Sequence, residues 1–161
     1  MRSMSSLIHK LKTDFWQLNF LPAEQFSWSP VTKTVFYAAN EPNAPLLLLH
    51  ELGHATLEHH DYQRDISLLA METAAWGVAA ELASTYKVRM SDDVIQDHLD
   101  TYRDWLHARS TCPECGATGY QTEARQYRCV ACSHEWRVNE ARGCALRRYQ
   151  VRASIKEPRH Y

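Results

Sequence analysis

The pentapeptide His50-Glu51-Leu52-Gly53-His54 constrains this chain more than any other segment. On a helix, two histidines four residues apart lie one turn apart on one face, so both imidazoles can reach a single metal ion. The glutamate between them can take a proton from a water bound to that metal. The apolar run Leu46–Leu49 and Pro45 are typical of the first turns of a buried helix. The pattern therefore predicts a zinc-binding helix with Glu51 as general base.

A third protein ligand is required, and the sequence offers two candidates. His60 occupies the last position of the longer pattern HExxHxxGxxH, but Leu57 stands where that pattern has a helix-breaking glycine. We therefore expect the helix to continue and His60 to point along it, away from the metal. Glu58 and His59 are expected to cap or solvate the helix end.

Glu72 is the second candidate, and we favour it. Suppose that the first helix ends near His60 and a second begins near Asp65. The chain then rises about 9 Å along the first helix from His54 to its end, and returns about 10.5 Å along the second from its start to Glu72. An antiparallel pair of helices would then bring Glu72 level with His54. Glu72 would share its helix face with three further residues, Ala75, Trp76 and Ala79. The small alanines predict a close approach of the two helices.

The motif His50–His54 followed by Glu72-Thr73-Ala74-Ala75-Trp76 resembles the ImmA/IrrE metallopeptidases, which are small members of the gluzincins. The resemblance covers roughly Leu7 to Tyr86. It implies His50, His54 and Glu72 as ligands of a catalytic zinc, and Glu51 as general base and acid in peptide-bond hydrolysis. It also implies an edge strand beside the active helix, along which a peptide substrate lies extended. The β-prone segment Thr32–Ala38 fits that place.

One position departs from the pattern of larger gluzincins. Those enzymes carry an acidic residue four positions after the glutamate, and here that residue is Trp76. The group that orients the ligand histidines is therefore not assigned by the sequence. The donor that would stabilise a tetrahedral oxyanion is also open among Tyr37, Tyr62 and His98.

Four downstream cysteines have the spacing CxxC-x13-CxxC. The pairs Cys112/Cys115 and Cys129/Cys132 can place four thiolates in a tetrahedron, which predicts a structural zinc in a β ribbon. Disulfides or a redox pair are the alternative, but nothing in the sequence indicates secretion. Gly116 permits a tight turn after the first pair, whereas Ser133 follows the second. Cys144 is interpreted as a free thiol.

We predict an α+β chain of two domains. Residues 1–110 would form a mostly helical zincin-like metallopeptidase domain with a small antiparallel sheet. Residues 111–161 would form a small β zinc ribbon with a basic C-terminal tail. Helices are expected over Ser6–Leu18 and from Ser91 through His107. We expect no membrane-spanning stretch, no signal peptide and a cytoplasmic location.

Charge is divided unevenly along the chain. Residues 1–111 hold 9 Lys/Arg and 14 Asp/Glu, whereas residues 112–161 hold 9 and 5. The basic module is compatible with DNA contact, with docking of a protein substrate, or with a tail that solvates or covers the active site. The basic side chains of its last stretch are Arg137, Arg142, Arg147, Arg148, Arg152, Lys156 and Arg159.

The favoured function is a zinc endopeptidase that acts on a protein or peptide substrate, by analogy a transcriptional regulator. One alternative is an inactive zincin-like scaffold that binds DNA or protein; the intact Glu51 argues against it, because a scaffold needs the ligands and not the base. Another is a SprT-like protease acting on DNA-bound proteins, which also joins HExxH to a zinc ribbon. The Glu72–Trp76 element fits that family less well. The sequence does not indicate the oligomeric state.

Overall fold

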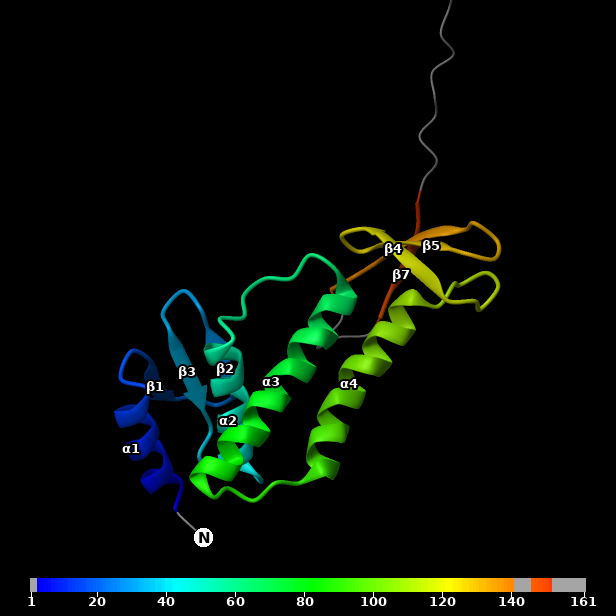
Figure 1. Cartoon of the computed structure of the whole chain (residues 1–161). Coiled ribbons are helices and arrows are strands. Elements are labelled where there is room, and N and C mark those ends of the chain that lie inside the picture. Colours follow the sequence, from blue (N-terminus) through cyan, green and yellow to red (C-terminus); the bar gives the residue numbers. More distant parts are fainter. Residues whose placement is uncertain (1–2, 141–145, 152–161) are drawn as a thin grey trace, which may run out of the picture. The chain divides into compact units, whose positions relative to one another are not determined.

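A computed structural model describes residues 3–140 and 146–151, and within them the chain forms four helices and two small sheets (Figure 1). The predicted α+β class is confirmed. By its contacts the chain divides into two units, Met1–Tyr62 with Ile66–Asp100, and Gln63–Asp65 with Thr101–Tyr161. Residues 101–110 thus group with the second unit, and the domain boundary after residue 110 stays a prediction.

The sheet of the first unit has three strands, β1 (Asn19–Pro22), β2 (Ser27–Ser29) and β3 (Thr34–Tyr37), in the order β1-β3-β2. β2 pairs antiparallel with β3, but β1 pairs parallel with it, so the predicted antiparallel sheet is in fact mixed. The reason is that the chain passes from β1 to the far side of β3 before it forms the β2–β3 hairpin. The expectation that Thr32–Ala38 supplies an edge strand is therefore wrong, because β3 is central and β2 is an edge.

Two helices accompany this sheet, α1 (Met4–Asp14) and α2 (Ala44–Thr56). The Ser3 side chain caps α1 by accepting the N–H of Ser6. The helix begins at Met4, two residues before the predicted start. α2 carries the HELGH motif and packs against β2 and β3 (Figure 1). Pro45 lies in its first turn as predicted. The core of the unit includes Leu48, Leu49 and Leu52 from α2, each fully buried.

α2 ends at Thr56, four residues earlier than expected, in a turn that closes the helix. Glu58 adopts a left-handed conformation with φ 53°. Its N–H donates to the carbonyl of Ala55 at 3.1 Å, and the N–H of His59 donates to the carbonyl of His54 at 2.9 Å. These two bonds define a Schellman motif, in which Glu58 takes the position usually filled by glycine.

α3 (Asp65–Tyr86) begins where the sequence predicts, and α4 (Asp92–Ser110) is preceded by Ser91, whose hydroxyl accepts the N–H of Val94 at 3.4 Å. By length and composition alone α3 could cross a membrane, which corrects the expectation that no stretch is long enough. Core helices of soluble proteins meet the same criterion. Trp76, Ala79 and Ala83 of α3 lie in the hydrophobic core of the first unit.

α2 and α3 approach so closely that their backbones touch. A Cβ added at Gly53 would overlap the carbonyl oxygen of Ala75 and lie 3.1 Å from its carbonyl carbon. Along the pair, His50 contacts Trp76 and His54 contacts Glu72, so the two helices run in opposite directions. The predicted antiparallel pairing and the face formed by Glu72, Ala75, Trp76 and Ala79 are confirmed, because all four side chains are buried.

The second unit contains a four-stranded sheet in the order β4-β5-β6-β7. Its strands are β4 (Gly119–Glu123), β5 (Gln126–Cys129), β6 (Glu135–Val138) and β7 (Arg148–Gln150). Arg109 is buried at 2% exposure and donates to Asp65 at 2.7 Å, and the Tyr127 hydroxyl donates to the same carboxylate oxygen at 2.6 Å. Removing one partner of such a buried pair typically costs about 3–5 kcal/mol, so these bonds anchor Gln63–Asp65 within the unit.

We expect Gly53→Ala to lower the free energy of unfolding by about 1–3 kcal/mol, because its methyl group must push α2 away from Ala75. Gly77→Ala is the matched control, since it lies on the exposed side of α3 with no atom within 4 Å of an added Cβ. That control should gain about 0.5–1 kcal/mol from the better helix propensity of alanine. Urea unfolding of both variants checks the prediction, and equal effects in the two would contradict the close helix approach.

Candidate metal centres

Three side chains of α2 and α3 bring ligand atoms together in the first unit. The Nε2 atoms of His50 and His54 lie 3.2 Å apart, and the Glu72 Oε2 atom lies 3.1 Å from the first and 3.4 Å from the second. All three residues are buried, at 5%, 8% and 5% exposure. The structure thus assembles the residues that the sequence predicted as ligands, and the helix pair alone is enough to do so.

The donor set fits a metal ion. Two imidazole nitrogens and one carboxylate oxygen all turn toward one point and lie within 4.8 Å of one another. Neutral imidazoles and a carboxylate are the ligands that zinc takes in sites that keep one position open.

Glu51 lies beside this cluster and is partly buried. Burial, its largest influence, raises the pKa of this carboxyl to about 7, while nearby His54 lowers it and nearby Glu72 raises it. The backbone N–H of Trp28 donates to the carboxylate and also lowers the pKa. Trp28 belongs to β2, so the edge strand of the sheet directly contacts the residue predicted as base. A pKa near neutrality suits a group that must both accept and release a proton.

The two ligand types have opposite shifts. Burial lowers the pKa of His50, and this outweighs the hydrogen bond to Glu72. Burial alone would raise the pKa of Glu72, but the hydrogen bonds from His50 and His54 outweigh it and hold the pKa well below its ordinary value. The resulting state, a neutral imidazole beside an ionised carboxylate, is the one in which both groups can bind a cation.

An aromatic ring occupies the position where larger gluzincins have an acidic residue. The Trp76 indole stacks on the His50 imidazole with ring centroids 4.1 Å apart and planes 21° apart. His50 Nδ1 is buried and has no hydrogen-bond partner among the described residues. His98 lies edge-on to Trp76 at 5.5 Å. Stacking thus replaces a hydrogen bond at His50, and the oxyanion role of Tyr37, Tyr62 or His98 stays a prediction.

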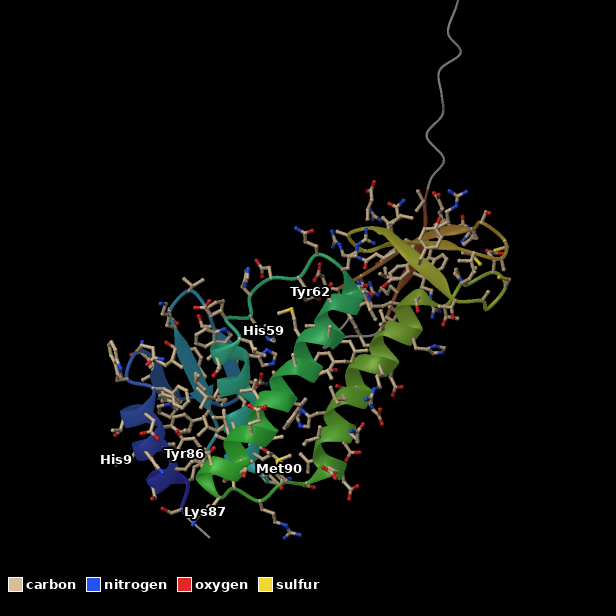
Figure 2. All side chains as sticks on the ribbon, in the orientation of Figure 1. His9, His59, Tyr62, Tyr86, Lys87 and Met90 are labelled. Atoms are coloured by element: carbon tan, nitrogen blue, oxygen red, sulfur yellow. The ribbon has the colours of Figure 1, made fainter. Side chains whose placement is uncertain are left out.

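His60 lies outside the cluster, as predicted, though the reason differs. Because α2 ends at Thr56, His60 is exposed on the following segment, where its Nδ1 lies 3.0 Å from the Glu58 carbonyl oxygen. His59, labelled in Figure 2, was expected only to cap or solvate the helix end, but its side chain contacts His54 instead. Its Nδ1 lies 2.8 Å from His54 Nδ1. Sequence reasoning missed this contact and the contact of Trp28 with Glu51, since neither follows from helical spacing.

The four predicted cysteines form a second cluster, in the second unit. Sγ of Cys112 lies 3.7 Å from that of Cys132, and Sγ of Cys115 lies 3.5 Å from that of Cys129. The backbone N–H groups of Cys132 and Ala131 donate to Cys129 and lower the pKa of its thiol to about 6. A thiolate at this position is ready to bind a metal.

The residues that follow the two cysteine pairs share one backbone conformation. Gly116 has φ 75° and Ser133 has φ 62°, so serine adopts the left-handed turn for which glycine was expected. Cys144 and the basic residues Arg142, Arg152, Lys156 and Arg159 lie outside the described residues. Elsewhere in the ribbon, Arg125 pairs with Glu140 and Arg128 with Glu135, both at the surface. DNA contact through this module stays a prediction.

The described residues therefore define an α+β protein with two candidate metal-binding clusters, one of two histidines and a glutamate and one of four cysteines. No protein-family model, curated protein or solved structure matches the chain. The assignment of function consequently depends on the geometry of these clusters.

The raised pKa of Glu51 predicts a pH-dependent stability in the metal-free protein. The native carboxyl holds its proton up to about pH 7, whereas the unfolded chain releases it near 4.5. The native state therefore loses stability as pH rises through this window, and above it Glu51→Gln should be more stable than wild type by on the order of 1–3 kcal/mol. Urea unfolding of chelator-treated wild type and Glu51→Gln at pH 4.5 and pH 8 measures this. A difference in unfolding free energy between the two proteins that does not grow with pH would contradict the prediction.

Proposed function

We propose that this protein is a zinc-dependent endopeptidase of the gluzincin type, similar to the ImmA/IrrE metallopeptidases. His50, His54 and Glu72 would hold the catalytic zinc, and Glu51 would act as general base and acid. The observation that carries this proposal is the convergence of three buried ligand atoms, with the partly buried carboxyl group of Glu51 as a fourth, ionisable group beside them. A site that only stored or transported a metal would have no use for that fourth group.

Bound zinc would supply positive charge that polarises a peptide carbonyl and acidifies an attacking water. The chain's own residues would do the rest. Glu51 takes a proton from the water as its oxygen bonds to the carbonyl carbon. It then gives that proton to the amine nitrogen as the C–N bond breaks. The Trp28 N–H holds the Glu51 carboxylate in place through both steps.

The substrate would be an extended segment of a protein chain. β2 is an edge strand and contacts Glu51 through Trp28. Trp28 is the middle residue of β2 and pairs in register with Val35 of β3. The other side of β2 has no strand partner among the described residues, and a peptide added there as a further strand would pass close to Glu51. A transcriptional regulator remains the proposed substrate class by analogy.

The cysteine cluster would bind a second zinc with a structural role. Four thiolates fill the coordination sphere and leave no position for water. Tyr127, Trp136 and Val138 form a small core around Cys112 and Cys129. So small a core gains stability from a metal, and we expect removal of this zinc to unfold the ribbon.

Metal content tests the two sites separately. Purified wild-type protein should contain two zinc ions per chain, whereas Glu72→Ala and Cys112→Ser should each contain one, because each loses a ligand of a different site. His60→Ala is the control and should keep both. Zinc is measured with a chromogenic chelator after denaturation. A loss of zinc in His60→Ala but not in Glu72→Ala would reject the His-His-Glu assignment.

Proteolysis tests the chemistry. We expect the zinc-loaded wild type to create new peptide termini in a mixture of unfolded proteins, detected by mass spectrometry. Glu51→Gln should keep both zinc ions and lose at least about 100-fold in rate, because it lacks the general base. Full cleavage by Glu51→Gln would refute the mechanism, and an absence of wild-type cleavage across such a mixture would count against a general endopeptidase.

A further inference from the structure

The two nitrogen atoms of the His54 imidazole have separate partners. Nε2 points into the ligand cluster, 3.2 Å from His50 Nε2 and 3.4 Å from Glu72 Oε2. Nδ1 points the other way and lies 2.8 Å from Nδ1 of His59, with the two ring centroids 5.0 Å apart. A histidine whose Nε2 binds a metal must carry its proton on Nδ1. His54 would then donate to His59, which accepts through its own Nδ1 lone pair and keeps its proton on Nε2.

The end of α2 is what brings the two rings together. In a Schellman motif the residue two positions beyond the helix cap lies over the third residue from the end of the helix, and their side chains commonly touch. Here these residues are His59 and His54. Glu58, in its left-handed conformation, makes the reversal. The usual apolar contact of this motif is replaced by a hydrogen bond between two imidazoles.

His59 is itself fixed by the edge strand. The indole Nε1 of Trp28 donates to the carbonyl oxygen of His59 at 2.8 Å. Together with the bond from its own N–H to the His54 carbonyl, this secures the backbone of His59 on both sides. The backbone that carries its ring is therefore fixed without the metal.

We propose that His59 is a positioning residue for the metal ligand His54. It fixes the ring orientation and the tautomer that leave the Nε2 lone pair free for the metal. This inference depends on the proposed metal site. In larger gluzincins an acidic residue at the position of Trp76 orients a ligand histidine. Here His59 would orient His54, and as a neutral group it adds no negative charge to the site.

The test compares zinc affinity at the His-His-Glu site in full-length variants by competition with a chelator of known affinity. His59→Ala should weaken binding by about 10–100-fold, the usual effect of removing an outer hydrogen-bond partner. His60→Ala removes the neighbouring imidazole, which does not contact His54, and should bind within about twofold of wild type. His59→Asn, whose amide oxygen can accept the same proton, should recover most of the affinity.

Two further measurements make the outcome decisive. The cysteine cluster serves as an internal reference, because its zinc should be unchanged in all three variants. The cobalt absorption spectrum should shift in His59→Ala, where the His54 ring is free to turn, and return in His59→Asn. Wild-type affinity in His59→Ala would overturn the inference. If wild type itself binds zinc only at the cysteines, the proposed function fails instead, and the two failures are distinguishable.

Discussion

The contact between Gly53 in α2 and the backbone of Ala75 in α3 determines the geometry of the ligand cluster. Each helix carries its ligands at fixed positions, so the distance between the helix axes decides whether Glu72 reaches the two histidines. A side chain at position 53 would overlap the carbonyl oxygen of Ala75 and separate the helices, which would move the Glu72 carboxylate away from the two histidines. Gly53, the fourth residue of the motif, therefore serves the packing of the two helices.

This close approach creates an electrostatic problem that a cation would solve. Two imidazoles and an ionised carboxylate are buried within hydrogen-bond distance of one another. The hydrogen bonds within the cluster keep Glu72 ionised, and a cation beside it would neutralise this buried negative charge. Stacking on Trp76 holds His50, whereas a hydrogen bond to His59 holds His54. The two ligand histidines are thus held by different means.

Helical periodicity explains why so much of the ligand set could be predicted. The spacing of His50 and His54, and the start of α3 at Asp65 with Glu72 two turns later, follow from 3.6 residues per turn. The order of the strands does not follow from periodicity, because β-propensity marks β3 without indicating its neighbours. The end of α2 was also missed, since Glu58 occupies a left-handed position for which sequence rules expect glycine. The contact of His59 with His54 depends on that unexpected turn.

Trp28 connects the two parts that sequence reasoning missed. Its backbone N–H donates to Glu51, and its indole donates to the carbonyl of His59. The first bond needs only a strand at this place, and any residue except proline could supply it. The second needs a long side chain with a donor, which the indole of Trp28 supplies. The edge strand thus contacts Glu51 through its backbone, and through its side chain it holds His59, which contacts His54. Because a substrate strand would pair with the same edge, the catalytic groups and the substrate would share one rigid support.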